Sequence, residues 1–208
     1  MDVERDAERK AGRSVGRPRA FDADDALERA MLVFWRHGYE GASTANLTNA
    51  MGISTTSMYA AFGNKEKLFR KVLERYTDGP SEYMARALEE PTALGVATAI
   101  LAGTVRTTTR PASPHGCLGV QSALTASDSG QEVRDLLVDW RNDGYTRVRE
   151  RFRRAVDEGD LPPDADPGLL ARYITTFGYG IAVQAASGVD RAELQETADA
   201  ALRDWPPR

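Results

Sequence analysis

Hydroxyl side chains gather at the start of one short predicted helix, where they could contact nucleic acid. Ser54 is suited to cap this helix, and another short predicted helix, residues 44–51, precedes it. Small hydroxyl groups at a helix N-terminus can approach base edges and phosphates closely, and the N–H groups there favour an anion. A lysine at the start of the following helix is placed to contact the flanking backbone. The residues predicted on this ground to contact DNA are Thr55, Thr56, Ser57, Tyr59 and Lys65.

Side chains for enzyme or metal chemistry are scarce. His37 and His115 are the two histidines and Cys117 is the single cysteine, which excludes a dedicated zinc site and an intrachain disulfide. A Cys117–His115 pair would have no evident orienting partner, and no phosphate-binding loop, dinucleotide-binding turn or paired-carboxylate site is present. We therefore expect no enzyme, no metal and no cofactor. Because Leu118 and Val120 flank Cys117, we interpret its thiol as buried and unreactive.

Charge is distributed unevenly along the chain. The net charge of −4 and the pI of about 5.3 exclude a uniformly basic surface. Between Lys10 and Lys71, however, ten basic and six acidic residues give +4, whereas the chain from Val72 onward carries −6. This asymmetry indicates an anion-binding N-terminal part on an acidic body. The sequence begins without a signal peptide, and its apolar run at residues 94–103 is too short to span a membrane, so we expect a cytoplasmic protein.

Helix start and stop signals are clear in the N-terminal third. Asp22 is the predicted N-cap of a first helix that ends at Gly38. Gly52 allows a tight turn between two short helices, which is typical of a helix-turn-helix, and Asn64 is the predicted cap of the next helix. The alternative interpretation is that the hydroxyl residues of the second short helix only cap and solvate its end.

The predicted architecture is all-α with about nine helices. Residues 1–20 are interpreted as a flexible basic arm, residues 21–66 as a helix-turn-helix DNA-binding domain, and residues 67–208 as a helical effector-binding and dimerisation domain. The β-branched residues of 94–105 would also fit a strand, but their apolar stripe has helical spacing and no hairpin signal follows. The predicted helices of the body cover residues 94–105, 117–126, 131–158, 167–187 and 190–205.

A set of residues in the N-terminal third matches a known family at the family's spacing. The set comprises Phe34-Trp35-Arg36-His37-Gly38-Tyr39, Thr44, Gly52-Ile53-Ser54, Ser57-Met58-Tyr59, Phe62-Gly63-Asn64-Lys65-Glu66 and Leu68-Phe69. With these residues, the chain from about Arg17 to Tyr76 resembles the tetracycline-repressor (TetR) family of bacterial transcription regulators. The remainder matches that family mainly in the number and length of its helices.

The resemblance implies DNA contacts by residue. Arg17 and Arg19 of the arm would reach the minor groove or the backbone beside the major groove. Many relatives carry an aromatic residue or a histidine where this chain has Ala60 and Ala61, so base reading would depend on two threonines and on contacts with thymine methyls. The other positions that contact DNA in the family are Thr44, Thr55, Thr56, Ser57, Tyr59 and Lys65, of which Tyr59 and Lys65 contact mainly phosphates.

The resemblance also implies a homodimer held by a four-helix bundle of the last two helices. The apolar faces of these helices are wide, which favours dimerisation over burial within one chain. A dimer would place two DNA-reading heads on a palindromic operator. The predicted interface residues are Leu170, Tyr173, Ile174, Phe177, Ile181, Leu194, Ala198 and Leu202.

The expected function is that of a ligand-responsive repressor, released from double-stranded operator DNA by a small hydrophobic or aromatic molecule. The alternative is a helical interaction module without specific DNA binding. A fourth helix that tilts when ligand enters would change the spacing of the two heads, provided that the ligand binds the released state more tightly. The predicted lining of the effector cavity is Met84, Leu101, Val105, Cys117, Leu118, Gln121, Trp140 and Phe177.

Overall fold

The computed structural model describes residues 21–124 and 131–207, and within these ranges every regular element is an α-helix. The predicted all-α class is confirmed, with ten helices in place of about nine. The helices are α1 (Ala23–Gly41), α2 (Thr44–Met51), α3 (Thr55–Phe62), α4 (Lys65–Asp78), α5 (Tyr83–Ala87), α6 (Ala93–Thr108), α7 (Leu118–Leu124), α8 (Gln131–Asp157), α9 (Pro167–Ala186) and α10 (Arg191–Ala201).

Side-chain caps fix where the N-terminal helices begin. The Asp22 carboxylate accepts from the backbone N–H groups of Asp24 and Asp25 at 2.9 and 3.2 Å. Ser54 and Asn64 cap α3 and α4 in the same way, so the three predicted caps are confirmed. These bonds satisfy N–H groups that have no partner within the helix itself.

Glycines end the helices of this region. Gly52, at φ 70°, ends α2 in the left-handed region, as predicted. Gly38 also leaves the helical conformation, at φ 67°, but a further turn follows it and carries α1 to Gly41. The predicted end of the first helix is therefore a kink.

Two elements of the body differ from the predicted helices. Helix α5 was not anticipated, because five residues are too few to show an apolar period and no side chain caps it. Helix α10 ends at Ala201, four residues before the predicted end. Beyond it the Trp205 ring packs 5.5 Å from that of Phe152 and 6.5 Å from that of Tyr173, between centroids. This packing and the following prolines turn the chain away from the helix axis.

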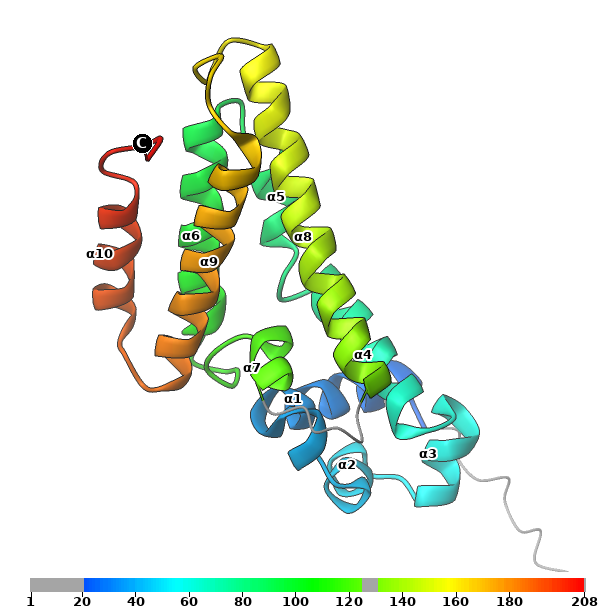
Figure 1. Ribbon diagram of the computed structural model, residues 1–208. Coiled ribbons are helices and arrows are strands. Elements are labelled where there is room, and N and C mark those ends of the chain that lie inside the picture. Colours follow the sequence, from blue (N-terminus) through cyan, green and yellow to red (C-terminus); the bar gives the residue numbers. More distant parts are fainter. Residues whose placement is uncertain (1–20, 125–130, 208) are drawn as a thin grey trace, which may run out of the picture.

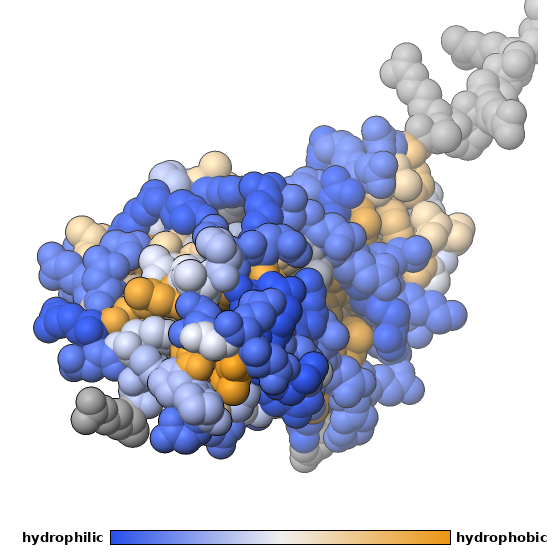
Figure 2. All heavy atoms as spheres, turned by 90° about the horizontal axis from the view of Figure 1, so that it is seen from above, coloured by the Kyte–Doolittle hydropathy of each residue, from blue (hydrophilic) through white to orange (hydrophobic). Residues whose placement is uncertain are grey.

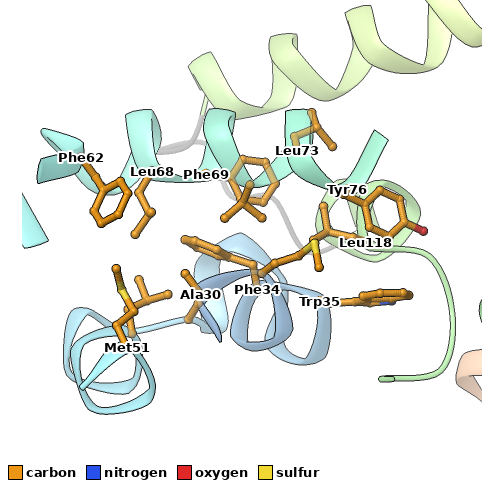
Figure 3. Close-up of a cluster of buried hydrophobic side chains, with 14 of the residues drawn as sticks. Ala30, Phe34, Trp35, Met51, Phe62, Leu68, Phe69, Leu73, Tyr76 and Leu118 are labelled. Carbon is orange, nitrogen blue, oxygen red and sulfur yellow. The ribbon is translucent and has the colours of Figure 1, made fainter. Parts of the chain in front are cut away.

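The helices form two hydrophobic clusters at opposite ends of α8. In Figure 1, α1, α2 and α3 lie at one end of the molecule, and α6, α9 and α10 lie side by side at the other. The head cluster joins α1–α4, and Figure 3 shows Phe34 of α1 facing Leu68 and Phe69 of α4. This cluster continues beyond residue 66, the predicted domain boundary, to Tyr76, and takes in Leu118.

The body cluster is built from α6, α8, α9 and α10, with α6 packed along α9. Seen from the end far from the head, the surface is mostly hydrophilic and carries small separate hydrophobic patches (Figure 2). Hydrophobic residues scattered in this way are ordinary on a protein surface. Among the helices of residues 21–124 and 131–207, none combines the length and the apolar character that crossing a membrane requires.

Helix α7 lies at the junction of the two parts. Leu118 is fully buried in the head cluster, whereas its neighbour Cys117 faces a cavity of the body. Just before α7, the carbonyl of Gly116 accepts a buried 3.0 Å hydrogen bond from the indole N–H of Trp35 in α1. The start of α7 is thus fixed to the first helix of the head.

Candidate nucleic-acid interface and body cavity

Helices α2 and α3 form the predicted helix-turn-helix. Met58 and Phe62 anchor α3 in the head cluster, with at most 7% of either residue exposed. This orientation turns the other side of α3 outward, where Thr55 and Thr56 are exposed and Tyr59 keeps 44% of its surface. The exposed helix N-terminus combines small hydroxyl groups with N–H groups, which is the chemistry that contacts phosphates and base edges.

Ser57 differs from its neighbours because it takes part in the cap. Its N–H donates to Oγ of Ser54 at 3.1 Å, and the two hydroxyl oxygens lie 2.9 Å apart. Ser57 is also half-buried. The capping interpretation therefore describes this pair, whereas Thr55 and Thr56 remain available on the surface.

Lys65 begins α4 beside the aromatic ring of Tyr39. Its ammonium nitrogen lies 4.4 Å from the ring centroid, a cation–π contact. Burial lowers the pKa of Lys65, and the nearby carboxylate of Glu40 partly opposes this shift. Tyr39 thus orients the cation, a role that the sequence prediction missed. Tyr39 belongs to the recognised motif, but residue spacing cannot predict a contact between the end of α1 and the start of α4.

The other residues predicted to contact DNA are Thr44, Arg17 and Arg19. Thr44 is the half-buried first residue of α2, and its carbonyl accepts a 2.9 Å bond from the hydroxyl of Thr48. Arg17 and Arg19 lie outside the described residues. Of the predicted set, α2, α3 and the start of α4 therefore carry Thr44, Thr55, Thr56, Ser57, Tyr59 and Lys65.

A cavity opens in the body between the head and the α6–α9 layer. It has about 120 Å³ of space for the centres of water-sized spheres. Three of the eight predicted residues, Met84, Cys117 and Trp140, lie in its wall. The lining residues from α4, α5, α6, α7, α8, α9 and the adjoining segments are Thr77, Ser81, Tyr83, Met84, Ala85, Leu88, Ile100, Thr104, Cys117, Val120, Trp140, Asp143, Gly144, Arg147, Ile174, Thr175, Gly178, Tyr179 and Ala182.

The other five predicted lining residues have other surroundings. Leu101 and Val105 are fully buried in the body cluster, and Leu118 in the head cluster. Phe177 packs against Tyr173, with 4.8 Å between ring centroids, and the Gln121 amide donates to the carbonyl of His115 at 3.1 Å. An apolar helical stripe does not distinguish a side chain that faces a cavity from one that faces a neighbouring helix.

The Cys117 thiol is held in an apolar part of the wall. The hydroxyl of Tyr76 donates to its sulfur at 3.4 Å. Burial raises the pKa of Cys117, which outweighs the opposing effect of this hydrogen bond. The thiol is therefore protonated at neutral pH, as expected for an unreactive buried cysteine.

The faces of α9 and α10 that were predicted to join two subunits are largely covered within one chain. Leu170, Ile174, Ile181, Leu194 and Ala198 are each at most 3% exposed, because α6 packs on α9 and α10 packs on both. Tyr173, Phe177 and Leu202 are half-buried beside them. Residues with so little exposed area can contribute little surface to a second subunit.

The opposite side of α9 is the more exposed one. It carries Leu169, with 59% of its surface exposed, and Val183, with 39%. Gly180 lies between them with open space where a side chain would be. The spacing of three and eleven residues places Gly180 on the same helical face as both.

Close packing at Gly119 links α7, α8 and α4. A Cβ at this position would lie 2.5 Å from Cζ3 of Trp140, whose indole N–H donates to the Thr77 hydroxyl at 2.9 Å. We expect Gly119→Ala to displace the indole and lower the free energy of unfolding by about 1–3 kcal/mol. Urea denaturation followed by tryptophan fluorescence measures this loss.

Gly144→Ala is the matched control, since nothing lies within 4 Å of a Cβ built there in α8. That variant is expected to keep or slightly raise stability, because alanine favours the helix. Equal stability of the two variants would contradict the packing argument.

Comparisons with known proteins agree with this geometry. Residues 26–72 match the family model of bacterial regulatory proteins of the tetR family. Residues 94–202 match the model of the tetracyclin repressor-like C-terminal domain. The HTH-type transcriptional repressor ComR of Escherichia coli (strain K12) is 34% identical over 199 residues, which cover 93% of each chain.

Two solved structures extend the agreement to the fold. The TetR family transcriptional regulator CifR, a cysteine mutant complexed with 26bp double-strand operator DNA, is 45% identical with a TM-score of 0.87, covering 91% of this chain and 100% of CifR. A TetR transcriptional regulator from Rhodococcus sp. RHA1 is 40% identical with a TM-score of 0.61, covering 88% of this chain and 98% of that one. These proteins are regulators and not enzymes. The chain belongs to the TetR family of helix-turn-helix transcriptional regulators.

Proposed function

We propose that this protein is a homodimeric repressor that binds a palindromic operator and leaves it when a small molecule occupies the body cavity. The observation that carries the proposal is the exposed N-terminal face of α3, with Thr55, Thr56 and Tyr59 presented by a buried helix-turn-helix core. The operator complex of the similar regulator CifR supports the same use of this fold.

The contacts divide into base reading and backbone binding. Thr55 and Thr56 would read base edges in the major groove, whereas Tyr59 and Lys65 would bind phosphates at its borders. Thr44 and Ser57 would support the backbone contacts beside α3. Arg17 and Arg19 of the N-terminal segment would add charge in the adjacent minor groove.

The dimer would form through the exposed face of α9. Leu169, Gly180 and Val183 share this face, and the absence of a side chain at Gly180 would let two helices approach closely. A second copy of this chain would cover the apolar area and would pair the two heads at the spacing of an operator's half-sites.

Ligand control would act through the elements shared by cavity and head. Thr77 in α4 and Cys117 just before α7 line the cavity. Their neighbours in the chain, Tyr76 and Leu118, belong to the head cluster. A ligand that displaced these walls would move α4 and α7 relative to α1. It would release the operator only by binding the released arrangement more tightly.

The test of DNA binding is a fluorescence-anisotropy titration on the DNA upstream of the protein's own gene, with scrambled DNA as the control. We expect tight, sequence-selective binding whose affinity falls steeply as salt rises. Absence of binding to either DNA at low salt would overturn the proposal and favour a helical interaction module.

Lys65→Met is expected to weaken binding to operator and scrambled DNA by similar factors. Affinity falls as salt rises, so the slope of log affinity against log salt is negative. Each lost phosphate contact should make this slope shallower by about one per subunit. Lys71→Met, which removes an exposed lysine from the same helix, is the control for net charge. A loss of operator affinity at unchanged salt slope would contradict a phosphate contact by Lys65.

A further inference from the structure

Most polar groups in the cavity wall are already hydrogen-bonded within the protein. The Tyr83 and Thr104 hydroxyls lie 3.0 Å apart, and Thr104 also bonds the carbonyl of Ile100. Thr175 donates to the carbonyl of Ala171 at 2.9 Å. Thr77 donates at 2.8 Å to a backbone carbonyl of its own helix and accepts from an indole N–H. Because these groups already have partners, they contribute little to orienting a ligand in the cavity.

Two donors beside the cavity lack an acceptor among the described residues. Nη1 of Arg141 is buried and has no hydrogen-bond partner there. The phenol of Tyr179, in the cavity wall, makes no hydrogen bond to residues 21–124 or 131–207. Leaving the buried Arg141 nitrogen without a partner is costly, because it carries part of a positive charge.

Arg141 adjoins residues of α8 that line the cavity, and Tyr179 of α9 lines it directly. Arg141 follows Trp140 and precedes Gly144 by three residues on α8, and both of these neighbours line the wall. The guanidinium charge opposes the rise that burial causes in the pKa of Tyr179 and of Cys117.

The charges around the cavity favour an anion. Arg147 and Asp143 line the cavity and Arg141 belongs to the same segment of α8, so one positive charge remains in excess over residues 140–147. The rest of the wall is mostly apolar, with Met84 and Ile174 among its side chains. A ligand with a charged acceptor at one end and an apolar body would match both parts.

We propose that the effector is a small monocarboxylic acid whose carboxylate accepts hydrogen bonds from Arg141 and Tyr179. Its short aliphatic or aromatic body fills the apolar remainder of the cavity. The cavity has about 120 Å³ of space for the centres of water-sized spheres, which is several times what one water molecule needs. This assignment rests on the proposed role of the cavity as the effector site and names the chemical class of its ligand.

The test compares two carboxylates with their neutral amides. Benzoate and hexanoate, with benzamide and hexanamide as uncharged partners of similar shape, are titrated into the full chain by isothermal calorimetry without DNA. We expect at least one carboxylate to bind at least about tenfold more tightly than its amide, because charged acceptors strengthen hydrogen bonds. Equal affinity of acid and amide, or no binding by either acid, overturns the proposal.

Three variants assign the contact. Arg141→Met should lower the affinity for the carboxylate about tenfold or more, and Tyr179→Phe should lower it several-fold. Both variants should have little effect on the affinity for the amide. Arg154→Met is the control, since it removes an exposed arginine from the same helix beside Glu158. Unchanged carboxylate affinity in both Arg141→Met and Tyr179→Phe overturns the assignment. Tyr179→Phe keeps the ring and therefore remains informative if Arg141→Met fails to fold.

The calorimetry separates this inference from the proposed repressor function. Carboxylate binding that leaves operator affinity unchanged would retain the site and overturn ligand-controlled release. Selective operator binding without carboxylate binding would retain the DNA-binding function and overturn the ligand class.

Discussion

Replacing Phe34 with alanine is expected to lower the free energy of unfolding by about 3–5 kcal/mol. Phe34 is fully buried in the head, with its ring centroid 5.1 Å from that of Phe69 and 6.1 Å from that of Tyr39. Its loss leaves a cavity between α1 and α4 and removes the aromatic packing that holds the start of α4. Urea denaturation followed by circular dichroism measures the change, and operator affinity should fall with it.

Leu94→Ala is the control for this prediction. This substitution also shortens a large apolar side chain to alanine. Leu94, however, lies at the start of α6 with 48% of its surface exposed. We expect its effect to stay within about 1 kcal/mol, because the side chain leaves little buried area behind. A Phe34→Ala variant no less stable than Leu94→Ala would contradict the assigned head core.

The second large effect is expected from Val183→Glu. In the proposed dimer the exposed face of α9 meets its symmetry copy, so the variant would bring two carboxylates into an apolar contact. Burying unpaired like charges is costly, and the dimer should dissociate into monomers. Operator affinity should fall by about a hundredfold or more, because one head loses the gain from simultaneous binding of its partner.

Sedimentation velocity measures the mass, and anisotropy titration measures the operator affinity. Asn142→Asp adds one negative charge to an exposed position of α8 and is expected to stay dimeric. A Val183→Glu protein that remains a dimer of normal operator affinity would place the interface on another face.

Local sequence signals were sufficient for the helix-turn-helix. Asp22, Ser54 and Asn64 cap their helices through bonds to residues two or three positions away, and Gly52 needs only its own left-handed conformation. These interactions depend on neighbours in the chain, so the helices and their order follow from residue type and spacing. The recognised motif adds the family and the residues of α3 that face outward.

The faces of the longer helices could not be assigned in the same way. The broad apolar surface of α9 was consistent with burial against α6, against a cavity or against a second subunit. The structure places Ile174 in the cavity wall and Ile181 in the body core, and it leaves Val183 exposed. One amphipathic pattern fits each of these neighbours because hydrophobicity records that a side chain is buried and not what buries it.

The sequence by itself therefore determined the all-α class, the starts of the head helices and the regulator family of this protein. Only the tertiary structure decided that Lys65 lies on Tyr39, that Trp35 is bonded to Gly116, and that Arg141 has a buried nitrogen without an acceptor. Each of these features joins residues from separate elements or depends on what surrounds a side chain in space. Such contacts arise from packing between helices, whereas caps, turns and periodicity arise within them.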